Sequence, residues 1–365
     1  MRRASLVGCL LVPAVVLAGQ LTLKDLPARG EWRFYPERIW QIDRAGNEEF
    51  GRIAELLISD NEYVCVRDFG RNVSYLFDKN GTFVRTFAPC GEGSGQLPFY
   101  LNRFQAGNKV VLAAPDKLHY FSEDGVFERA VKNDLFARFP LWFMSESEFI
   151  YAPNLPQSPV HDTKLVAADL PSGGERLLLD FSEPGYRNDR SLRGPMLMIP
   201  SLTPQVKVAY DRGRMIFGRN DRYKVFIANR AGRILATFGL DRRDTTVTLQ
   251  DKQTLLSGAK MPADQKEQIL AQLPNETTCF SQLCLVDGFI CVFAVTDPKH
   301  KTRSQQIDIF SDSGTYLYRG TLDFGGGKAF AGASDLVLKG RSAYVILEDG
   351  RGDQILAKYR ISLPR

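Results

Sequence analysis

The sequence predicts an all-β chain folded as a six-bladed β-propeller of four-stranded antiparallel blades, and three observations lead to this prediction. Short β-rich runs recur in groups of four along the chain, separated by turn residues. The third-strand turn glycines Gly81 and Gly125 lie 44 residues apart, which is about the length of a propeller blade. The last group has only three strands, and a candidate for the fourth stands near the N-terminus.

Composition agrees with a globular chain. Its 365 residues are 44% apolar and 24% charged, which excludes disordered, collagen-like and membrane-embedded proteins. At about 150 residues per domain the length favours two domains, but a propeller of this size forms one unit. The chain has only 3 histidines, so an enzyme that needs several histidine ligands for a metal is disfavoured.

Residues 1–18 have the form of a cleaved signal peptide, which leaves 19–365 for the propeller. Two arginines precede an apolar stretch from Leu6 to Leu17, and Ala18 is a small residue suited to cleavage. No stretch reaches the roughly 18 apolar residues of a membrane span. Cys9 resembles a lipidation site, but too few residues precede it. We therefore expect a periplasmic or extracellular protein with no lipid anchor.

Net charge bears on the choice of partner. Removal of the signal peptide takes away Arg2 and Arg3 and lowers the formal charge from +5 to +3. So small a charge on a chain of this length disfavours nucleic acid as the main partner.

The clearest blade runs from Ile53 to Phe87. Its four strands read IAELLISD, NEYVCVRD, VSYLFDKNG and TFVRTF. The turns between them carry Asp, Asn and Gly, which tolerate tight or left-handed backbone. We interpret this unit as a four-stranded meander.

Five further blades follow, and the N-terminus completes the last one. Their approximate ranges are 100–131, 141–181, 206–238, 282–322 and 335–361. Residues 38–43, RIWQID, continue into RAGNEEFGRI and match the outer strand and connection VRTFAPCGEGSGQL of the first blade. They are expected to form the outer strand of the sixth blade, which closes the ring and hides its open ends.

One blade carries a resemblance to a known family. Residues 68–97, DFGRNVSYLFDKNGTFVRTFAPCGEGSGQL, are similar to an NHL repeat in the F-D-x-x-G turn, the F-x-R-T-F strand and the G-x-G-Q-L connection. Residues 109–131 and 224–239 match less fully. The chain thus resembles secreted bacterial six-bladed propellers of NHL type. Such propellers serve as binding platforms, lyases, lactonases and receptor modules, so the resemblance implies a fold rather than one function.

Loop lengths differ between the two faces of the predicted ring. The second-to-third loops and the blade-to-blade connections share one face, here called the long-loop face, and the remaining turns form the short-turn face. The long-loop face carries three insertions, at 154–162, 182–204 and 241–278. We expect binding on this face, because length and variation of loops accompany function.

The insertion at 241–278, between blades 4 and 5, contains a predicted helix over 262–273. Pro262 suits the first turn of a helix, and Ile269, Leu270 and Leu273 share one side. This insertion is expected to act as a lid over the channel mouth or as a partner surface.

Positive charge gathers on the long-loop face and indicates a rim for an anionic partner, such as an acidic glycan, a phosphate-bearing ligand or an acidic protein. The candidate ligand-binding residues are Arg71, Arg187, Arg190, Arg193, Arg219, Arg222, Lys299, His300, Lys301, Arg303 and Arg351. Acidic residues on the same face leave a second interpretation open, in which these loops are simply solvated; they are Glu183, Asp189, Asp221 and Asp349.

Metal-binding patterns are weak. The three histidines, His119, His161 and His300, share no zinc-site spacing.

An aspartate recurs near the end of the second strand in five blades, at Asp68, Asp116, Asp221, Asp297 and Asp349. Lactonase-like propellers, by resemblance, hold calcium with acidic and amide groups, and Asn220 beside Asp221 is the pair most suited to it. An Asp once per blade more often caps its own turn. We expect no cofactor, with calcium as the alternative.

Five cysteines remain after the signal peptide: Cys65, Cys90, Cys279, Cys284 and Cys291. An odd number leaves at least one free thiol or an intermolecular bridge. Cys284 and Cys291 flank the turn Asp287–Gly288 and are expected to face each other at a position where the backbones of the two strands exchange hydrogen bonds. The wider spacing of such pairs favours two free thiols over a disulfide.

These observations favour an exported, non-catalytic binding or protein-interaction module that uses the long-loop face. The alternative is a metal-dependent, lactonase-like hydrolase or lyase with its site at the channel mouth. The ligand and the oligomeric state stay open at this stage.

Overall fold

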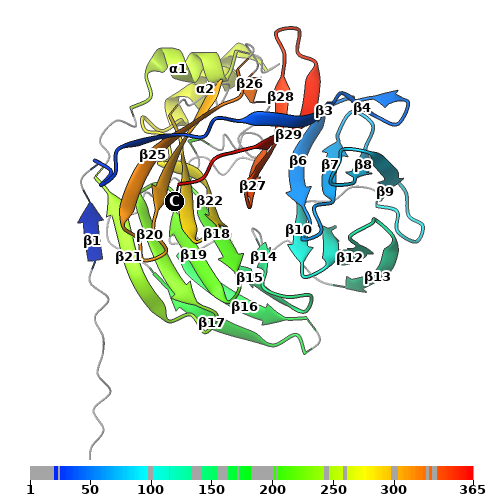
Figure 1. Cartoon of the computed structure of the whole chain (residues 1–365), viewed down its shortest axis with the longest axis horizontal. Coiled ribbons are helices and arrows are strands. Elements are labelled where there is room, and N and C mark those ends of the chain that lie inside the picture. The colour runs from blue at the N-terminus through cyan, green and yellow to red at the C-terminus, as the bar shows by residue number, and fades with distance from the viewer. Residues whose placement is uncertain are drawn as a thin grey trace, which may run out of the picture.

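Six antiparallel sheets form a ring in the computed structural model, which confirms the predicted propeller (Figure 1). The structure describes residues 20–23, 25–97, 102–114, 116–132, 141–153, 163–170, 172–181, 201–202, 204–241, 246–257, 261–296, 303–325, 329–330 and 335–364.

Blades 1 to 3 are four-stranded meanders with their first strand innermost. Blade 1 contains β6 (Ile53–Ile58), β7 (Val64–Asp68), β8 (Val73–Phe77) and β9 (Phe83–Phe87). Blade 2 contains β10 (Asn102–Ala106), β11 (Lys109–Ala113), β12 (Lys117–Ser122) and β13 (Phe127–Lys132). Blade 3 contains β14 (Leu141–Phe143), β15 (Glu148–Tyr151), β16 (Lys164–Asp169) and β17 (Glu175–Asp180).

Blades 4 and 5 repeat this order, and the first strand of blade 6 is divided into two pieces. Blade 4 contains β18 (Val206–Asp211), β19 (Arg214–Arg219), β20 (Lys224–Asn229) and β21 (Ile234–Leu240). Blade 5 contains β22 (Phe280–Val286), β23 (Phe289–Ala294), β24 (Ser304–Phe310) and β25 (Tyr316–Asp323). Blade 6 contains β26 (Ala329–Phe330), β27 (Leu336–Lys339), β28 (Ser342–Glu348) and β29 (Gln354–Arg360).

The N-terminal segment closes the ring as predicted. Strand β3 (Glu37–Ile42) pairs antiparallel with β29 and supplies the outer strand of blade 6. The small hairpin of β4 (Arg44–Ala45) and β5 (Glu48–Glu49) then leads into blade 1.

The same segment also covers two other blades, which the sequence did not indicate. Strand β1 (Gln20–Leu23) pairs parallel with β21 of blade 4, and β2 (Glu31–Arg33) pairs parallel with β25 of blade 5. The blue ribbon in Figure 1 therefore runs along the outer edges of three successive blades. Such short parallel edge strands carry too few residues to show a period in the sequence.

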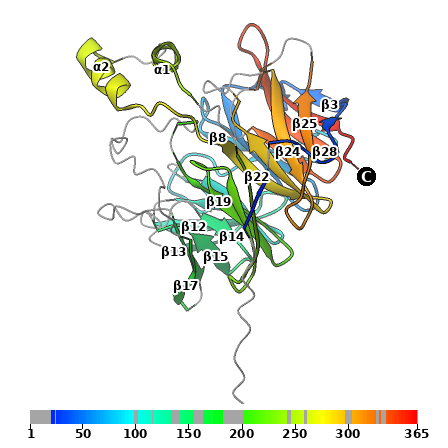
Figure 2. The same ribbon diagram turned by 90° about the vertical axis from the view of Figure 1, so that its left-hand side faces the viewer.

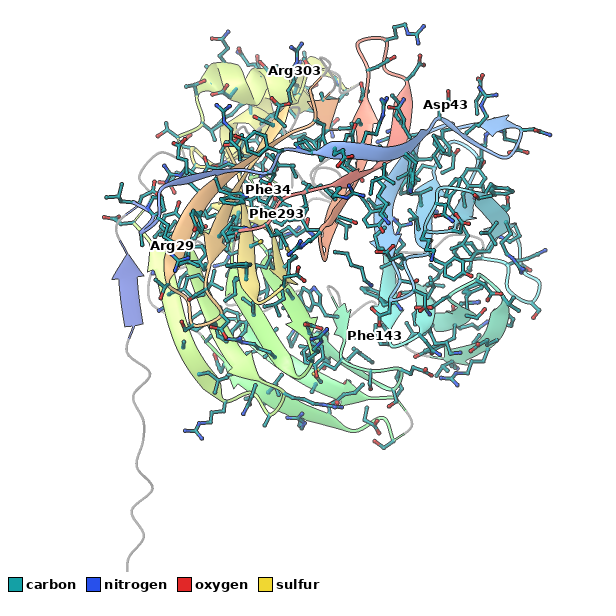
Figure 3. The ribbon with its side chains drawn as sticks, in the orientation of Figure 1. Arg29, Phe34, Asp43, Phe143, Phe293 and Arg303 are labelled. Atoms are coloured by element: carbon teal, nitrogen blue, oxygen red, sulfur yellow. The ribbon has the colours of Figure 1, made fainter. Side chains whose placement is uncertain are left out.

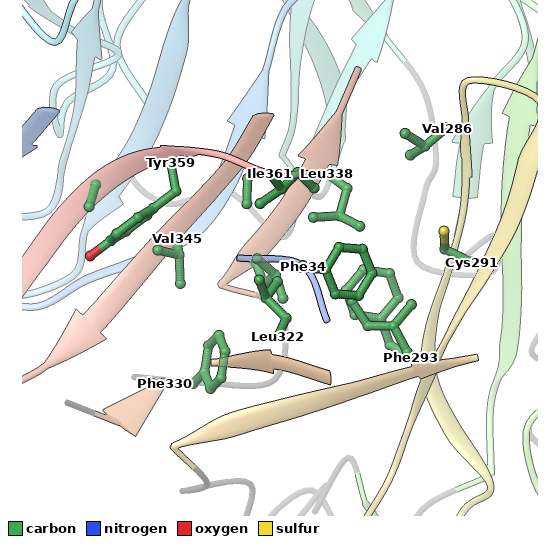
Figure 4. Packing of buried hydrophobic residues seen from close by; sticks show 14 of the residues in the cluster. Phe34, Val286, Cys291, Phe293, Leu322, Phe330, Leu338, Val345, Tyr359 and Ile361 are labelled. Atoms are coloured by element: carbon green, nitrogen blue, oxygen red, sulfur yellow. The ribbon is translucent and has the colours of Figure 1, made fainter. Parts of the chain in front are cut away.

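Among the described residues, apolar side chains form one cluster at each of the six seams between neighbouring blades, and a seventh cluster packs the helical insertion between blades 4 and 5. The cluster between blades 5 and 6 includes Phe34 from the N-terminal segment, which is fully buried beside Phe293 and Leu322 (Figure 4). Closure therefore depends on side-chain packing as well as on strand pairing.

Two helices lie in the insertion between blades 4 and 5. The predicted helix is α2 (Ala263–Gln272), and α1 (Leu249–Leu255) precedes it. Thr248 and Asp251 form a capping box at the start of α1, a pattern that was readable in the sequence. Figures 1 and 2 show both helices at the periphery of the ring, standing out from one face, so their place suits a partner surface rather than a lid. Neither helix is long or apolar enough to cross a membrane, nor is any other in the described chain.

Charged pairs bridge neighbouring blades on the short-turn face. Lys339 of blade 6 pairs with Asp60 of blade 1, with 2.9 Å between Nζ and Oδ1. Glu148 of blade 3 pairs with Arg230 of blade 4, with 2.6 Å between Oε2 and Nη2. Glu123 of blade 2 accepts the Asp60 backbone N–H at 3.1 Å. This face therefore joins the turns of adjacent blades.

Candidate functional site

Asp68, the clearest of the recurring aspartates, holds two loops of blade 1 together. Its fully buried carboxylate accepts the backbone N–H groups of Gly51 at 2.7 Å, Arg52 at 2.9 Å and Arg71 at 3.1 Å. The first two donors lie just before β6, and the third lies in the loop after β7. The carboxylate therefore serves as a structural link between the blade connection and the second-to-third loop.

Asn220 makes the corresponding link in blade 4. Its Oδ1 accepts the backbone N–H of Gln205 at 2.7 Å, and its Nδ2 donates to the carbonyl of Phe280 at 2.8 Å. Asp221 forms an ion pair with Arg219, with 3.0 Å between Oδ2 and Nη1. The most metal-like pair of the sequence is thus engaged in fold contacts. No cluster of three His, Cys, Asp or Glu side chains suited to a metal occurs among the described residues.

The other recurring aspartates have different roles. Asp349 accepts the backbone N–H groups of Arg351 at 2.8 Å and Asp353 at 3.1 Å, and these bonds lower the pKa of its carboxyl. Asp116 lies 3.7 Å from the ammonium of Lys117 on the surface. Asp297 lies outside the described residues. Blades 1 and 6 therefore use this position to cap their own turns.

Several of the candidate ligand-binding arginines form ion pairs with acidic neighbours. Arg71 lies 3.2 Å from Glu48, from Nη1 to Oε2, and Arg351 lies 3.1 Å from Asp353, from Nη2 to Oδ2. Arg219 has the partner already described. These pairs lower the net positive charge that the face presents to a ligand.

Of the remaining candidate ligand-binding residues, the structure describes two. Arg303 is exposed at the end of the blade 5 loop (Figure 3), and Arg222 is half-buried. Six candidates lie outside the described residues, namely Arg187, Arg190, Arg193, Lys299, His300 and Lys301. Of the histidines, His119 is buried beside Phe127, and this burial lowers its pKa. His161 lies outside the described residues.

A second group of charged residues comes from the first strands of three adjacent blades. Glu55 is the third residue of β6, Arg103 is the second residue of β10, and Asp335 directly precedes β27. We call these three residues the inner-strand cluster. First strands begin at the long-loop face, so the cluster lies at that end of the ring's inner wall. Arg103 is 6% exposed and Asp335 3% exposed, so both are buried.

Direct contacts connect the cluster. Asp335 Oδ1 accepts the backbone N–H of Glu55 at 3.1 Å. Arg103 donates from Nη2 to the Ala54 carbonyl at 3.2 Å, and its Nη1 lies 3.8 Å from the Cys65 sulfur. Burial raises the pKa of Asp335 to about 6; the hydrogen bond from the Glu55 backbone N–H and the charge of Arg103 oppose this rise, and the charge of the Glu55 side chain adds to it. The carboxyl of Asp335 therefore changes its protonation state near pH 6.

Glu55 is unusual both in its backbone conformation and in the surroundings of its carboxylate. Its φ is 57°, in the left-handed region, where β6 loses register with β7 between Ala54 and Leu57. A non-glycine residue held in such a conformation costs of order 1–3 kcal/mol, and such strain clusters at functional sites. The Oε2 atom of Glu55 is buried and makes no hydrogen bond within the described part of the chain.

A fourth blade also carries an ionisable side chain near the start of its first strand, namely Lys207 of blade 4. It is the second residue of β18, and its Nζ donates to Gln205 Oε1 at 2.9 Å. Burial lowers its pKa to about 8. Four of the six blades thus place an ionisable side chain at the start of their inner strand.

Sequence reasoning did not identify these residues because it compared the ends of second strands, where an aspartate recurs. The available signal was a charged residue within an otherwise apolar first strand, as in IAELL around Glu55 and DLVL at Asp335. First strands are covered by both neighbouring blades, so a charge there needs a partner or a function.

Fold and site together define a six-bladed propeller with a largely buried charged cluster on its long-loop side. No protein-family model and no curated protein sequence matches the chain. Among solved structures, a DUF4221-family protein from Bacteroides vulgatus has a TM-score of 0.59 at 10% identity, covering 91% of this chain and 99% of that one. That likeness supports the fold alone.

Two further structures show weaker likeness. A protein from Bacteroides fragilis has a TM-score of 0.49 at 14% identity, covering 94% of this chain and 99% of that one. Virginiamycin B lyase from Staphylococcus aureus has a TM-score of 0.45 at 10% identity, covering 88% and 99%.

Proposed function

We propose that this chain is an exported, non-catalytic binding module of NHL-like type that takes its ligand on the long-loop face, over the inner-strand cluster. One observation carries the proposal. Glu55 is held in a strained conformation with a buried carboxylate oxygen that no described residue hydrogen-bonds. An incoming hydroxyl or N–H donor would satisfy that oxygen, and the gain would offset part of the strain.

An acidic glycan is the ligand class that this face suits best. Its hydroxyl groups would donate to the carboxylates of Glu55 and Asp335. Its acid groups would accept from cationic side chains of the same face, such as Arg303, and charge-assisted bonds of this kind are strong. This function needs no cofactor, and elemental analysis of the purified chain would detect calcium if calcium takes part.

Calorimetric titration tests the proposal. Alginate is titrated into residues 19–365, with neutral dextran as the control ligand. Glu55→Gln and Arg103→Gln are expected to weaken alginate binding at least about tenfold, the equivalent of roughly 1.4 kcal/mol. Glu123→Gln alters a buried glutamate of the short-turn face and is expected to bind like the parent. Binding that is unchanged in both cluster variants, or equal for dextran, would contradict the proposal.

One observation favours a second function, a hydrolase or lyase at the same site. Asp335, whose pKa is raised to about 6, lies beside the ionisable Glu55, an arrangement suited to general acid–base catalysis. The test is hydrolysis of an aliphatic γ-lactone with and without added calcium. Turnover that disappears in Asp335→Asn would support an enzyme. Absence of turnover, or the same turnover in that variant, would count against one.

A further inference from the structure

Two cysteines of blade 5 lie opposite each other in a fixed register. The strands β22 and β23 are joined by Asp287 and Gly288, whose φ values of 46° and 83° are those of a tight hairpin turn. This turn sets Cys284 directly across from Cys291. Their side chains therefore leave the sheet on the same side.

This geometry suits a disulfide. Hydrogen-bonded antiparallel pairs have Cα atoms about 5.5 Å apart, and disulfides most often span about 5.5–6 Å. The neighbouring Cys291 thiol, together with burial, raises the pKa of Cys284 well above its ordinary value. The wider spacing of the pair is therefore no obstacle to a bond, although both thiols are free here.

The two thiols differ in exposure. Cys291 is fully buried at the edge of the apolar cluster between blades 5 and 6, where Figure 4 shows it on the blade 5 side. Cys284 is half-buried. An external oxidant therefore meets Cys284 first. Among the described strands, no other two cysteines are register partners.

We propose that Cys284 and Cys291 form an oxidisable dithiol that a disulfide-bearing thiol oxidant converts to an intramolecular disulfide. The Cys284 thiolate attacks the oxidant's disulfide, forms a mixed disulfide and releases one oxidant thiolate. The Cys291 thiolate then attacks the Cys284 sulfur, forms the intramolecular bond and releases the second thiolate. The two protons of the cysteines pass to the released thiolates, and the oxidant gains two electrons.

Folding controls the rate of this reaction. The thiolate is the attacking species, and the folded environment raises the pKa of Cys284 and buries Cys291. We expect fast oxidation before blade 5 packs against blade 6 and slow oxidation afterwards. The inference goes beyond ligand binding and relies on the proposed function only for the exported, oxidising location.

Peptide mapping tests the inference directly. Residues 19–365 are refolded from denaturant in a buffer of oxidised and reduced glutathione, and free thiols are then alkylated under denaturing conditions. The peptide ending at Lys299 is expected to carry a Cys284–Cys291 bond and to lack two hydrogens. Cys279 lies on the same tryptic peptide, so Cys279→Ser is used to establish the pairing. The reduced, folded chain in the same buffer is expected to oxidise more slowly.

Matched serine variants show whether the disulfide depends on Cys284 and Cys291. Cys65→Ser changes a buried thiol of another blade and is expected to leave the bond intact, while Cys284→Ser is expected to leave Cys291 reduced. Full alkylation of both cysteines after oxidative refolding would overturn the inference. So would a glutathione adduct on Cys284 that Cys291 does not displace. Alginate titration of the reduced and oxidised forms reports on ligand binding separately, so failure of one proposal is distinguishable from failure of the other.

Discussion

The two faces of this ring use charged side chains in different ways. On the short-turn face, charges pair across the seams, as Arg230 does with Glu148 and Lys339 with Asp60. On the long-loop face, Arg103 and Asp335 of the inner-strand cluster are buried, and the half-buried Glu55 adopts a strained backbone. Both faces therefore join neighbouring blades, the short-turn face through ion pairs and the long-loop face through hydrogen bonds to backbone groups, and within the described residues Glu55 Oε2 of the cluster is left without a hydrogen bond.

Removal of the N-terminal segment is expected to have the largest effect. A chain lacking residues 20–43 loses strands β1, β2 and β3 together with the buried Phe34. Blade 6 then keeps an unpaired edge at β29, and the pairs that close the short-turn face no longer hold a ring together. We expect loss of cooperative unfolding, monitored by circular dichroism during heating. The control is the chain that begins at residue 19, and a similar melting curve for both chains would refute closure by this segment.

The substitution Asp335→Asn tests whether this buried carboxyl of the long-loop face makes stability depend on pH. The folded pKa of about 6 exceeds the unfolded value of about 3.9, so the folded state binds the proton more tightly. Stability from this group is therefore complete below about pH 4 and is lost as the pH rises through 6. The full shift corresponds to roughly 3 kcal/mol, an order-of-magnitude figure. The variant should flatten the dependence of unfolding free energy on pH between 4 and 7.

Urea unfolding at pH 4.5 and at pH 7.5 measures this difference. Glu123→Gln, on the short-turn face, is the control and should keep the pH dependence that Asp335 causes. An Asp335→Asn chain that loses stability with rising pH as steeply as the parent would show that another group is responsible.

A smaller effect is expected from a pair on the short-turn face. Replacing Glu148 and Arg230 by Gln, singly and together, gives a double-mutant cycle for one seam. The arginine side chain is 55% exposed and the glutamate side chain 18%, so the coupling should be about 0.5–1 kcal/mol and should fall at high salt. Coupling well above this range would mean that a single pair holds the seam.

Charge reversal on the blade 5 loop should leave stability unchanged. Substituting Glu for Lys299, Lys301 and Arg303 alters residues expected to be solvated, so the melting temperature should stay within about 1 °C of the parent's. Binding of alginate should weaken, because like charges now face the ligand. Equal binding by the reversed and parent chains would remove this loop from the ligand-binding face.

Much of the fold was predictable because each blade repeats one local pattern. The glycine turns, the two-residue hairpin at Asp287–Gly288 and the helix after Pro262 all depend on backbone preferences of a few adjacent residues. The strand at residues 38–43 was found because it matches the outer strand of blade 1. By contrast, β1 and β2 match no repeat, and only their pairing with β21 and β25 makes them strands.

The site was predictable to a lesser degree. The aspartates at the ends of second strands were visible, and the structure shows that Asp68 and Asp349 cap loops. The inner-strand cluster was not found, because Glu55, Arg103 and Asp335 belong to three different blades. The contact between Asp335 and Glu55 depends on closing the ring, which no local pattern reports.

The sequence by itself determined the blades, their order and the strand that closes them, because these follow from turn residues and from alternation within about 40 residues. Only the tertiary structure decided which charges meet. Asp335 and Glu55 are 280 positions apart in the chain but share a hydrogen bond. Burial within the closed ring, rather than residue type, raises the pKa of Asp335, and within the described part of the chain Glu55 Oε2 is buried without a hydrogen bond.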